Sequence, residues 1–372
     1  MSDAEHLLRK KIVDIIDDEH LKNVCAQLLQ KRLIAIDTEF MRVDTYYPLA
    51  AVIQINDGDT NYLIDPLCIR QWQPLAAVLQ SPAVIKAFHA CSEDLDVFNT
   101  LLGVLPKQLF DTQVAAALLG MGASVGYGNL VNACLNVDLP KGETRSNWLA
   151  RPLTVAQIHY AALDVDYLYE LALLLEQQLI ALNRETWLYE ESQALLDNYI
   201  ANLDPASGFN KSNNTWRLKP LQLAKAKALF EWREHTAISK NTPRSRLIKD
   251  AQIFDIFFND VKNLVQLKLV GLHDGAIRKY GAQIIDICTQ EKLPDIELKP
   301  SQLPLTKQQR EYVKNLRDVV SALAEQFKIS PEILLRKNDY HTIARYCADE
   351  SYDIAVFVEH TQGWRHQFFS GL

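Results

Sequence analysis

Two carboxylates close a short apolar run near the start of the chain. Asp37 and Glu39 end the segment LIAIDTEF, which begins at Leu33. Such a run is typical of a strand buried on both faces, and side chains two positions apart on a strand point the same way. Like charges held that close are unfavourable unless something neutralises them, and Mg²⁺ prefers oxygen ligands. The pair therefore predicts a divalent-cation site; two solvated acids at an exposed strand end are the alternative.

Two helical segments supply the other candidates. Tyr160 and Asp164 are four residues apart in QIHYAALDVDYLYELALLL, so they share one helix face and can act on the same bound group. For Tyr160, ordinary packing at a helix–sheet boundary is the alternative. Asp94 opens a second helical segment in HACSEDLDVF, where Glu93 and Asp96 suit a helix N-terminus equally well. Spacing alone does not choose among these three acids.

The elements that must position these residues alternate between strand and helix in the first half of the chain. This alternation predicts an α/β domain with a mixed sheet. The expected strands are 33–40, 51–56, 61–64 and 83–89, and the expected helices lie around 68–80, 92–101, 112–119, 154–180 and 184–201.

The pattern changes near residue 205, where DPASGFNKSNN has the composition of a linker. Strand patterns stop there, and short helices follow, with a second break at LKPSQLPLT. We therefore expect an α/β domain over residues 1–205 and two small all-α domains over 211–294 and 300–372.

Charge is distributed unevenly along the chain, whose formal net charge is −7. Residues 1–210 carry a net −13, residues 211–294 a net +7 and residues 295–372 a net −1. An acidic body joined to a basic module suits an enzyme that holds cations at its site and binds a polyanion elsewhere; a solvated helical surface is the alternative.

The six scattered cysteines lack CxxC spacing, and the start of the chain has no apolar core. The cysteine pattern argues against a zinc site and favours a reducing cytoplasm, and the start of the chain does not fit a secretory signal. The most apolar helical stretch, Leu168 to Leu182, is interrupted by two glutamates and is too short to span a bilayer. No obligate protein partner is evident.

The motifs taken together resemble one known family. The spacing Asp-x-Glu, then Asp, then Tyr-x-x-x-Asp resembles the DEDD superfamily of 3′–5′ exonucleases. DTEFMRVDTYYP, LIDP, HACSEDLDVF, FDTQ and SNWLARPLT are similar to the exonuclease domain of ribonuclease D, in the same order over residues 30–180. The resemblance implies a ribonuclease-H-like fold, and it selects Asp94 over its two acidic neighbours.

The resemblance also implies a mechanism with two divalent ions, Mg²⁺ or Mn²⁺, one activating a water and the other stabilising the departing 3′ oxygen. It implies that Asp37 bridges both ions, that Glu39 and Asp164 hold the first ion, and that Asp94 supports the second. Tyr160 would orient the attacking water, because an unperturbed pKa near 10 makes a phenol a poor general base. The expected products are 5′-mononucleotides.

His159 is a rival to Tyr160, because another branch of the superfamily uses His beside the nucleophile. On a regular helix with about 100° per residue, Tyr160 lies about 40° from the Asp164 direction, whereas His159 lies far from it. The helical pattern already includes the two residues before His159. Helix geometry therefore favours Tyr160.

Other residues are candidates for contacts with the substrate. Phe40 and Met41 could pack on the terminal base, with core packing as the alternative. Arg145, Trp148 and Arg151 match family motif positions and could touch phosphate or base, although Trp148 could instead anchor its loop.

The helical half resembles the helicase-and-ribonuclease-D C-terminal (HRDC) domain in its WRE, N-x-P and YG motifs at about 218–290. This resemblance implies nucleic-acid binding, in agreement with the local net charge of +7. Four basic residues around a helix break are candidate phosphate contacts: Lys240, Arg244, Arg246 and Lys249. Residues 305–372 look like a diverged copy of this domain. For this copy, packing against the enzyme is as good an interpretation as nucleic-acid binding.

Three functions fit these observations. The first is a 3′–5′ exoribonuclease acting on RNA with a single-stranded 3′ end, for which the family suggests transfer-RNA precursors and other small structured RNAs. The second is the same chemistry on DNA, and the third is a catalytically dead nucleic-acid-binding scaffold. The helical modules favour RNA, and the presence of all four acids disfavours the scaffold.

Overall fold

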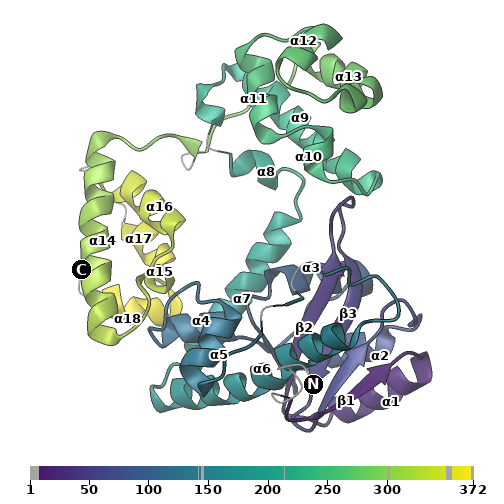
Figure 1. The fold of residues 1–372 in the computed structure, drawn as a ribbon. Helices are drawn as coiled ribbons and strands as arrows, with labels where there is room; N and C mark the ends of the chain where they lie inside the picture. The colour runs from purple at the N-terminus through teal and green to yellow at the C-terminus, as the bar shows by residue number, and fades with distance from the viewer. Residues whose placement is uncertain are drawn as a thin grey trace.

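The computed structural model describes residues 8–140, 142–143, 146–212, 214–299, 302–348 and 354–369. It consists of an α/β body (residues 8–203), a first helical module (207–289) and a second helical module (307–369). The three parts lie at the corners of a triangle, with the body at the bottom, the first helical module at the upper right and the second at the left (Figure 1).

The body is built on one mixed sheet of six strands in the order β1-β4-β3-β2-β5-β6. Strand β2 pairs with β3 in antiparallel and with β5 in parallel orientation, so it lies in the interior of the sheet. The strands are β1 (Lys11–Ile15), β2 (Leu33–Met41), β3 (Leu49–Asn56), β4 (Thr60–Ile64), β5 (Ile85–Phe88) and β6 (Leu109–Asp111).

Helices pack on both faces of this sheet. Ile34 and Ile36 of β2 join a buried cluster with helices α1, α2 and α3, whereas Leu33 and Ala35 join a cluster with α4, α5 and α6. Alternate residues of β2 therefore face opposite helical layers, as the pleat of a strand requires. The helices of the body are α1 (Asp18–Leu28), α2 (Gln73–Gln80), α3 (Ser92–Leu102), α4 (Thr112–Leu118), α5 (Tyr127–Leu135), α6 (Val155–Ala181) and α7 (Glu185–Asn202).

The first helical module has a core of its own, centred on Phe209, Phe230 and Phe254. It consists of α8 (Ser207–Asn210), η1 (Thr215–Arg217), α9 (Pro220–Ser239), α10 (Arg244–Leu247), α11 (Asp250–Phe258), α12 (Leu264–Leu269) and α13 (Asp274–Thr289). It meets the body at the loop between β2 and β3. There Asn241 Oδ1 accepts hydrogen bonds from the backbone amides of Tyr46 and Tyr47 at 3.0 Å each, and the Arg244 guanidinium lies 4.8 Å from the centre of the Tyr46 ring.

The second helical module shares a hydrophobic cluster with the body instead of forming a separate core. At the contact, the buried Glu191 carboxylate of α7 accepts hydrogen bonds from Trp364 Nε1 at 2.9 Å and from Arg336 at 2.8 Å, and it pairs with Arg365 at 2.6 Å. The rings of Trp187 and Trp364 stack with centroids 4.7 Å apart. The module consists of α14 (Lys307–Phe327), α15 (Pro331–Leu334), α16 (Lys337–Cys347), α17 (Ile354–His360), η3 (Gly363–Arg365) and α18 (His366–Phe369).

The expected mixed sheet followed by a helical second half is confirmed. Four elements of the body were absent from the sequence-based expectation: the edge strands β1 and β6, and the helices α1 and α5. The domain boundaries at 205, 211, 294 and 300 stay predictions. In the part of the chain that the structure describes, no helix combines the length and the apolar character needed to cross a bilayer.

Candidate active site

Asp37 and Glu39 stand where β2 leaves the core. Residues 33–36 are at most 1% exposed, whereas Asp37 and Glu39 are only partly buried. Both have odd positions on the strand, so they share the face that Leu33 and Ala35 turn toward α6. The two carboxylates therefore converge on the α6 side of the sheet.

Asp164 reaches the same point from α6. Ala161 and Ala162 are fully buried on this helix, and their small side chains let it approach the sheet closely. The Tyr127 hydroxyl on α5 donates a 2.5 Å hydrogen bond to the backbone carbonyl of Asp164, which fixes the helix at this residue. One carboxylate oxygen from each of Asp37, Glu39 and Asp164 lies within 4.8 Å of the others.

Tyr160 lies beside this cluster, and its hydroxyl is hydrogen-bonded to Asp164. Helix α6 starts before His159, because Thr154 and Gln157 form a capping box in which Thr154 N donates to Gln157 Oε1 at 2.9 Å. His159 thus belongs to a regular helical turn and is rotated well away from the Asp164 direction. This geometry favours Tyr160 as the residue beside the nucleophile.

Asp94 lies next to the cluster but outside the set of three. It is 6% exposed in the first turn of α3, and its Oδ1 accepts a 2.6 Å hydrogen bond from Thr38 Oγ1. Thr38 has an even position on β2 and points to the α3 layer, which explains why Asp94 approaches from the other side. Of its two acidic neighbours, Glu93 is exposed and Asp96 pairs with Arg42 at 2.8 Å. The fold thus gives three different environments to acids that spacing alone did not distinguish.

Asp111 organises the loop that places Asp94. This buried residue caps α4, where its carboxylate accepts from Gln113 N at 2.8 Å, and it also accepts from Ala90 N at 3.1 Å and Cys91 N at 2.9 Å. Sequence reasoning did not identify Asp111, Thr38 or Tyr127 as supports of the site. The only available signal was Asp111 in the FDTQ motif, immediately before a helical segment.

The electrostatics of the site oppose ionisation of its carboxylates. Burial raises the pKa of Asp37 to about 7, and burial together with the charge of Asp37 raises the pKa of Glu39 to about 8. Burial and the charge of Asp37 also raise the pKa of Asp94 and of Asp164 well above the usual range. The hydrogen bonds from Thr38 to Asp94 and from Tyr160 to Asp164 act in the opposite direction, because they favour the ionised carboxylate.

This donor set fits a divalent cation. Among the described residues, no Lys, Arg or His forms an ion pair with any of the four acids. The donors are hard carboxylate oxygens of the kind that Mg²⁺ and Mn²⁺ prefer. A cation between Asp37, Glu39 and Asp164 would stabilise the ionised carboxylates against the burial that raises the pKa of all three, and against the charge of Asp37 that adds to it at Glu39 and Asp164.

The other predicted contacts of the body have different environments. Phe40 and Met41 are half-buried directly beyond the acids. Trp148 is 1% exposed, and its ring centre lies 6.0 Å from that of Tyr160, which favours the anchoring role. Arg151 donates to Asp65 at 2.5 and 2.8 Å and to the Ala51 carbonyl at 2.7 Å, so it ties its loop to the sheet. Arg145 lies outside the described residues.

The four predicted basic contacts of the first helical module divide into two pairs. Lys240 and Lys249 are exposed. Arg244 donates to both carboxylate oxygens of Glu234, at 2.5 and 2.6 Å, and Arg246 pairs with Asp44 of the body. The two arginines therefore serve the contact with the body, and the two lysines keep their charge available to a ligand.

Comparisons with known proteins agree with this architecture. A 3′–5′ exonuclease family model matches residues 12–180, and an HRDC domain model matches residues 222–288. Ribonuclease D of Pseudomonas paraeruginosa is 41% identical over 327 residues, covering 87% of this chain and 86% of that protein. Ribonuclease D of Haemophilus influenzae is 33% identical over 337 residues, covering 89% and 84%. The crystal structure of Escherichia coli RNase D, an exoribonuclease involved in structured RNA processing, matches with a TM-score of 0.85 at 29% identity over 98% of this chain and 97% of that one.

Proposed function

The chain belongs to the ribonuclease D family and is a 3′–5′ exoribonuclease. From this premise we propose the residues that perform its reaction and the class of RNA that it trims. The observation that carries the proposal is the convergence of Asp37, Glu39 and Asp164 within 4.8 Å. Asp94, held by Thr38, completes the acidic set.

We assign Asp37, Glu39 and Asp164 as ligands of one divalent ion, and Asp37 with Asp94 as ligands of a second. Ions held there would activate water and stabilise the charge that develops on the departing 3′ oxygen. The four carboxylates must all be ionised to bind cations, and the hydrogen bonds from Thr38 and Tyr160 favour that state.

Tyr160 positions the attacking water in this proposal. Its hydroxyl is already oriented by its hydrogen bond to the Asp164 carboxylate, so it can orient a water bound at the acidic cluster. Phe40 and Met41 leave part of their apolar surface exposed beyond the acids, where the terminal base of the RNA can pack.

The proposed substrate is RNA with a single-stranded 3′ end, including transfer-RNA precursors and other small structured RNAs, and the proposed products are 5′-mononucleotides. Two observations support this choice: the basic first helical module, and the similarity to Escherichia coli RNase D, which is described as an exoribonuclease involved in structured RNA processing. Lys240 and Lys249 are the proposed phosphate contacts on that module.

The test is hydrolysis of 3′-labelled RNA and matched DNA with Mg²⁺ and with a chelator. We expect labelled mononucleotide from RNA only, and only with the metal. Asp37→Ala should abolish release while RNA binding persists. Asp295→Ala is the matched control, because Asp295 belongs to another acidic-x-acidic triplet and is exposed in the linker. Equal cleavage of DNA would contradict the substrate assignment, and an active Asp37→Ala variant would contradict the site.

A further inference from the structure

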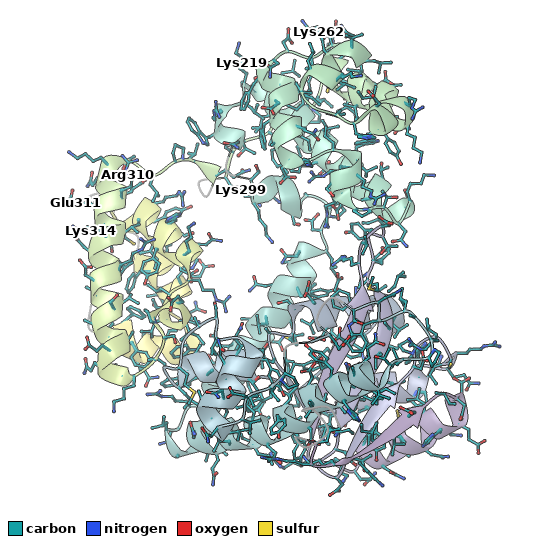
Figure 2. The ribbon with its side chains drawn as sticks, in the orientation of Figure 1. Lys219, Lys262, Lys299, Arg310, Glu311 and Lys314 are labelled. Carbon is teal, nitrogen blue, oxygen red and sulfur yellow. The ribbon has the colours of Figure 1, made fainter. Side chains whose placement is uncertain are left out.

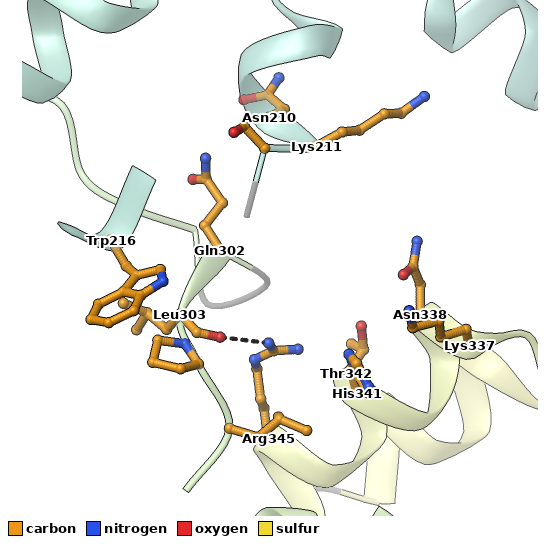
Figure 3. Close-up of a pocket in the computed structure, with 13 residues that line it drawn as sticks. Asn210, Lys211, Trp216, Gln302, Leu303, Lys337, Asn338, His341, Thr342 and Arg345 are labelled. Carbon is orange, nitrogen blue, oxygen red and sulfur yellow. Dashed lines mark hydrogen bonds between the residues drawn. The ribbon is translucent and has the colours of Figure 1, made fainter. Parts of the chain in front are cut away.

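A pocket of about 540 Å³ lies where the start of the first helical module meets the second helical module (Figure 3). One wall comes from Asn210 to Ser212 and Trp216, and the opposite wall from α16 between Lys337 and Arg345. Residues 302–305, which lead into α14, also line the pocket, and Leu303 lies beside Trp216 (Figure 3). None of the lining residues belongs to the α/β body, so the pocket is separate from the candidate active site.

The lining is positively charged. Lys211, Lys337 and Arg345 line the pocket, and no Asp or Glu is among its described lining residues. Lys211 is hydrogen-bonded to the uncharged amide of Asn202. An Arg345 Nη donates to the Leu303 carbonyl at 2.7 Å (Figure 3). Burial and the charges of Arg345 and Lys337 together lower the pKa of His341 on the same wall.

This concentration of charge is local. Residues 295–372 have a net charge of −1, so the second helical module as a whole does not attract anions. Lys337 and Arg345 share helix α16, whereas Lys211 comes from a segment more than a hundred residues earlier in the sequence, and the two segments meet only in the folded chain. Three cationic side chains around one cavity favour the interpretation that it binds a phosphate-bearing ligand over the alternative that it is an ordinary solvated surface.

An aromatic ring also lines the pocket. Trp216 is 45% exposed, and Figure 3 shows its indole on the opposite side of the pocket from Lys337 and His341. Asn210, Asn338 and Thr342 add uncharged hydrogen-bonding groups. Cationic groups for the backbone and an aromatic face for a base are the two features by which proteins hold single-stranded nucleic acid.

We infer that this pocket is a binding subsite for single-stranded RNA, in which Lys211, Lys337 and Arg345 contact backbone phosphate and Trp216 stacks on a base. The inference rests on RNA being the substrate of this exoribonuclease and goes beyond the proposed reaction at the acidic cluster. Because the pocket is outside the body, it binds nucleotides upstream of the 3′ end, and only RNA long enough to reach from the active site occupies it.

The first test measures binding of the full chain to a fluorescent single-stranded RNA in chelator, where hydrolysis does not interfere. Lys337→Gln should lower the slope of log Kd against log salt by about 0.7, the value for one lost phosphate contact on a single strand. Trp216→Ala should weaken binding about tenfold, within the range for loss of one base stack. Lys337→Arg and Trp216→Phe should retain most of the affinity.

Lys314→Gln is the matched control. Lys314 is exposed on the outer side of α14, away from the pocket (Figure 2). Lys337 and Trp216 are also exposed, so their substitution leaves the cores intact. Unchanged affinity and salt slope in both pocket variants, or equal losses in Lys314→Gln, would overturn the inference.

The second test separates the pocket from the active site. The pocket variants should hydrolyse a trinucleotide at the wild-type rate and lose efficiency only on long RNA. Equal losses on both substrates would overturn the inference. If the wild-type protein shortened neither RNA, the proposed function would fail, whereas the binding assay in chelator would still decide whether the pocket holds RNA.

Discussion

The hydrogen bond between Thr38 and Asp94 gives the most direct test of how the site is organised. Both residues are almost fully buried, at 7% and 6% exposure, and the donor and acceptor oxygens are 2.6 Å apart. Thr38→Val removes only the donor, because valine has nearly the same shape. A hydrogen bond to a charged group contributes about 1.5–3 kcal/mol. Its loss should raise the pKa of Asp94 further and leave the carboxylate less ionised and less well oriented.

We therefore expect Thr38→Val to weaken the apparent affinity for Mg²⁺ or the rate of RNA hydrolysis by about 10–100-fold, the usual effect of losing a partner of a metal-binding side chain. The assay is a Mg²⁺ titration of mononucleotide release, with thermal unfolding measured in parallel. Thr361→Val is the control, because Thr361 is 1% exposed and donates a 2.8 Å bond to the Phe357 carbonyl, far from the acids in sequence and module. A wild-type Mg²⁺ dependence and rate in Thr38→Val would refute the assignment of Asp94.

Three further predictions concern Tyr160, the acidic cluster and Glu191. Tyr160→Phe should slow hydrolysis about 100-fold, because a misplaced reactant costs that much, whereas His159→Ala should be nearly active; the reverse result in single-turnover assays would make His159 the orienting residue. Because the folded-state pKa values of Asp37 and Glu39, about 7 and 8, exceed their usual values near 4, the folded protein keeps protons that the unfolded chain releases. In chelator, stability should therefore fall as pH rises from about 4 to 8, and Mg²⁺ should raise the unfolding temperature more at pH 8.5 than at pH 6; equal shifts would contradict the metal assignment. Although burial opposes ionisation of Glu191, hydrogen bonds and charge from Arg365 hold its pKa below the usual range, so Glu191→Gln should cost about 3 kcal/mol in denaturant unfolding at neutral pH. That loss should shrink as pH falls below about 4.5, because the unfolded wild-type chain then takes up a proton at Glu191 that the folded protein still resists.

Local periodicity in the sequence predicted the side-chain directions that bring the residues of the acidic cluster together in the structure, whereas their roles in catalysis stay predictions. Asp37 and Glu39 follow from strand alternation, and Tyr160 with Asp164 follows from helical spacing. Asp94 does not follow in this way, because Glu93 and Asp96 satisfy the same helix start. The family resemblance selected it, and in the structure the tertiary contact with Thr38, 56 residues away, distinguishes it from these neighbours.

The missed elements have a similar explanation. β1 has five residues and carries Lys11 and Asp14, and β6 has only three residues, so neither shows a strand pattern by itself. Both are edge strands that form because β4 and β5 offer a partner. Trp148 and Arg151 were plausible ligand contacts by residue type, but the fold uses the Trp148 ring as core and the Arg151 donors for the loop, which no local pattern reports.

The contacts between the parts connect RNA binding to the catalytic strand. β2 carries Asp37 and Glu39 and continues into the loop whose residues Asp44 and Tyr46 contact Arg246 and Arg244 of the basic first helical module. On the opposite side, Glu191 fastens the second helical module to the body through two arginines and a tryptophan. Both helical modules are thus fixed by polar contacts to elements of the body. If RNA is held by the exposed lysines of the first module and by the Trp216 pocket, as we propose, these fixed contacts give the strand a defined path relative to the acids.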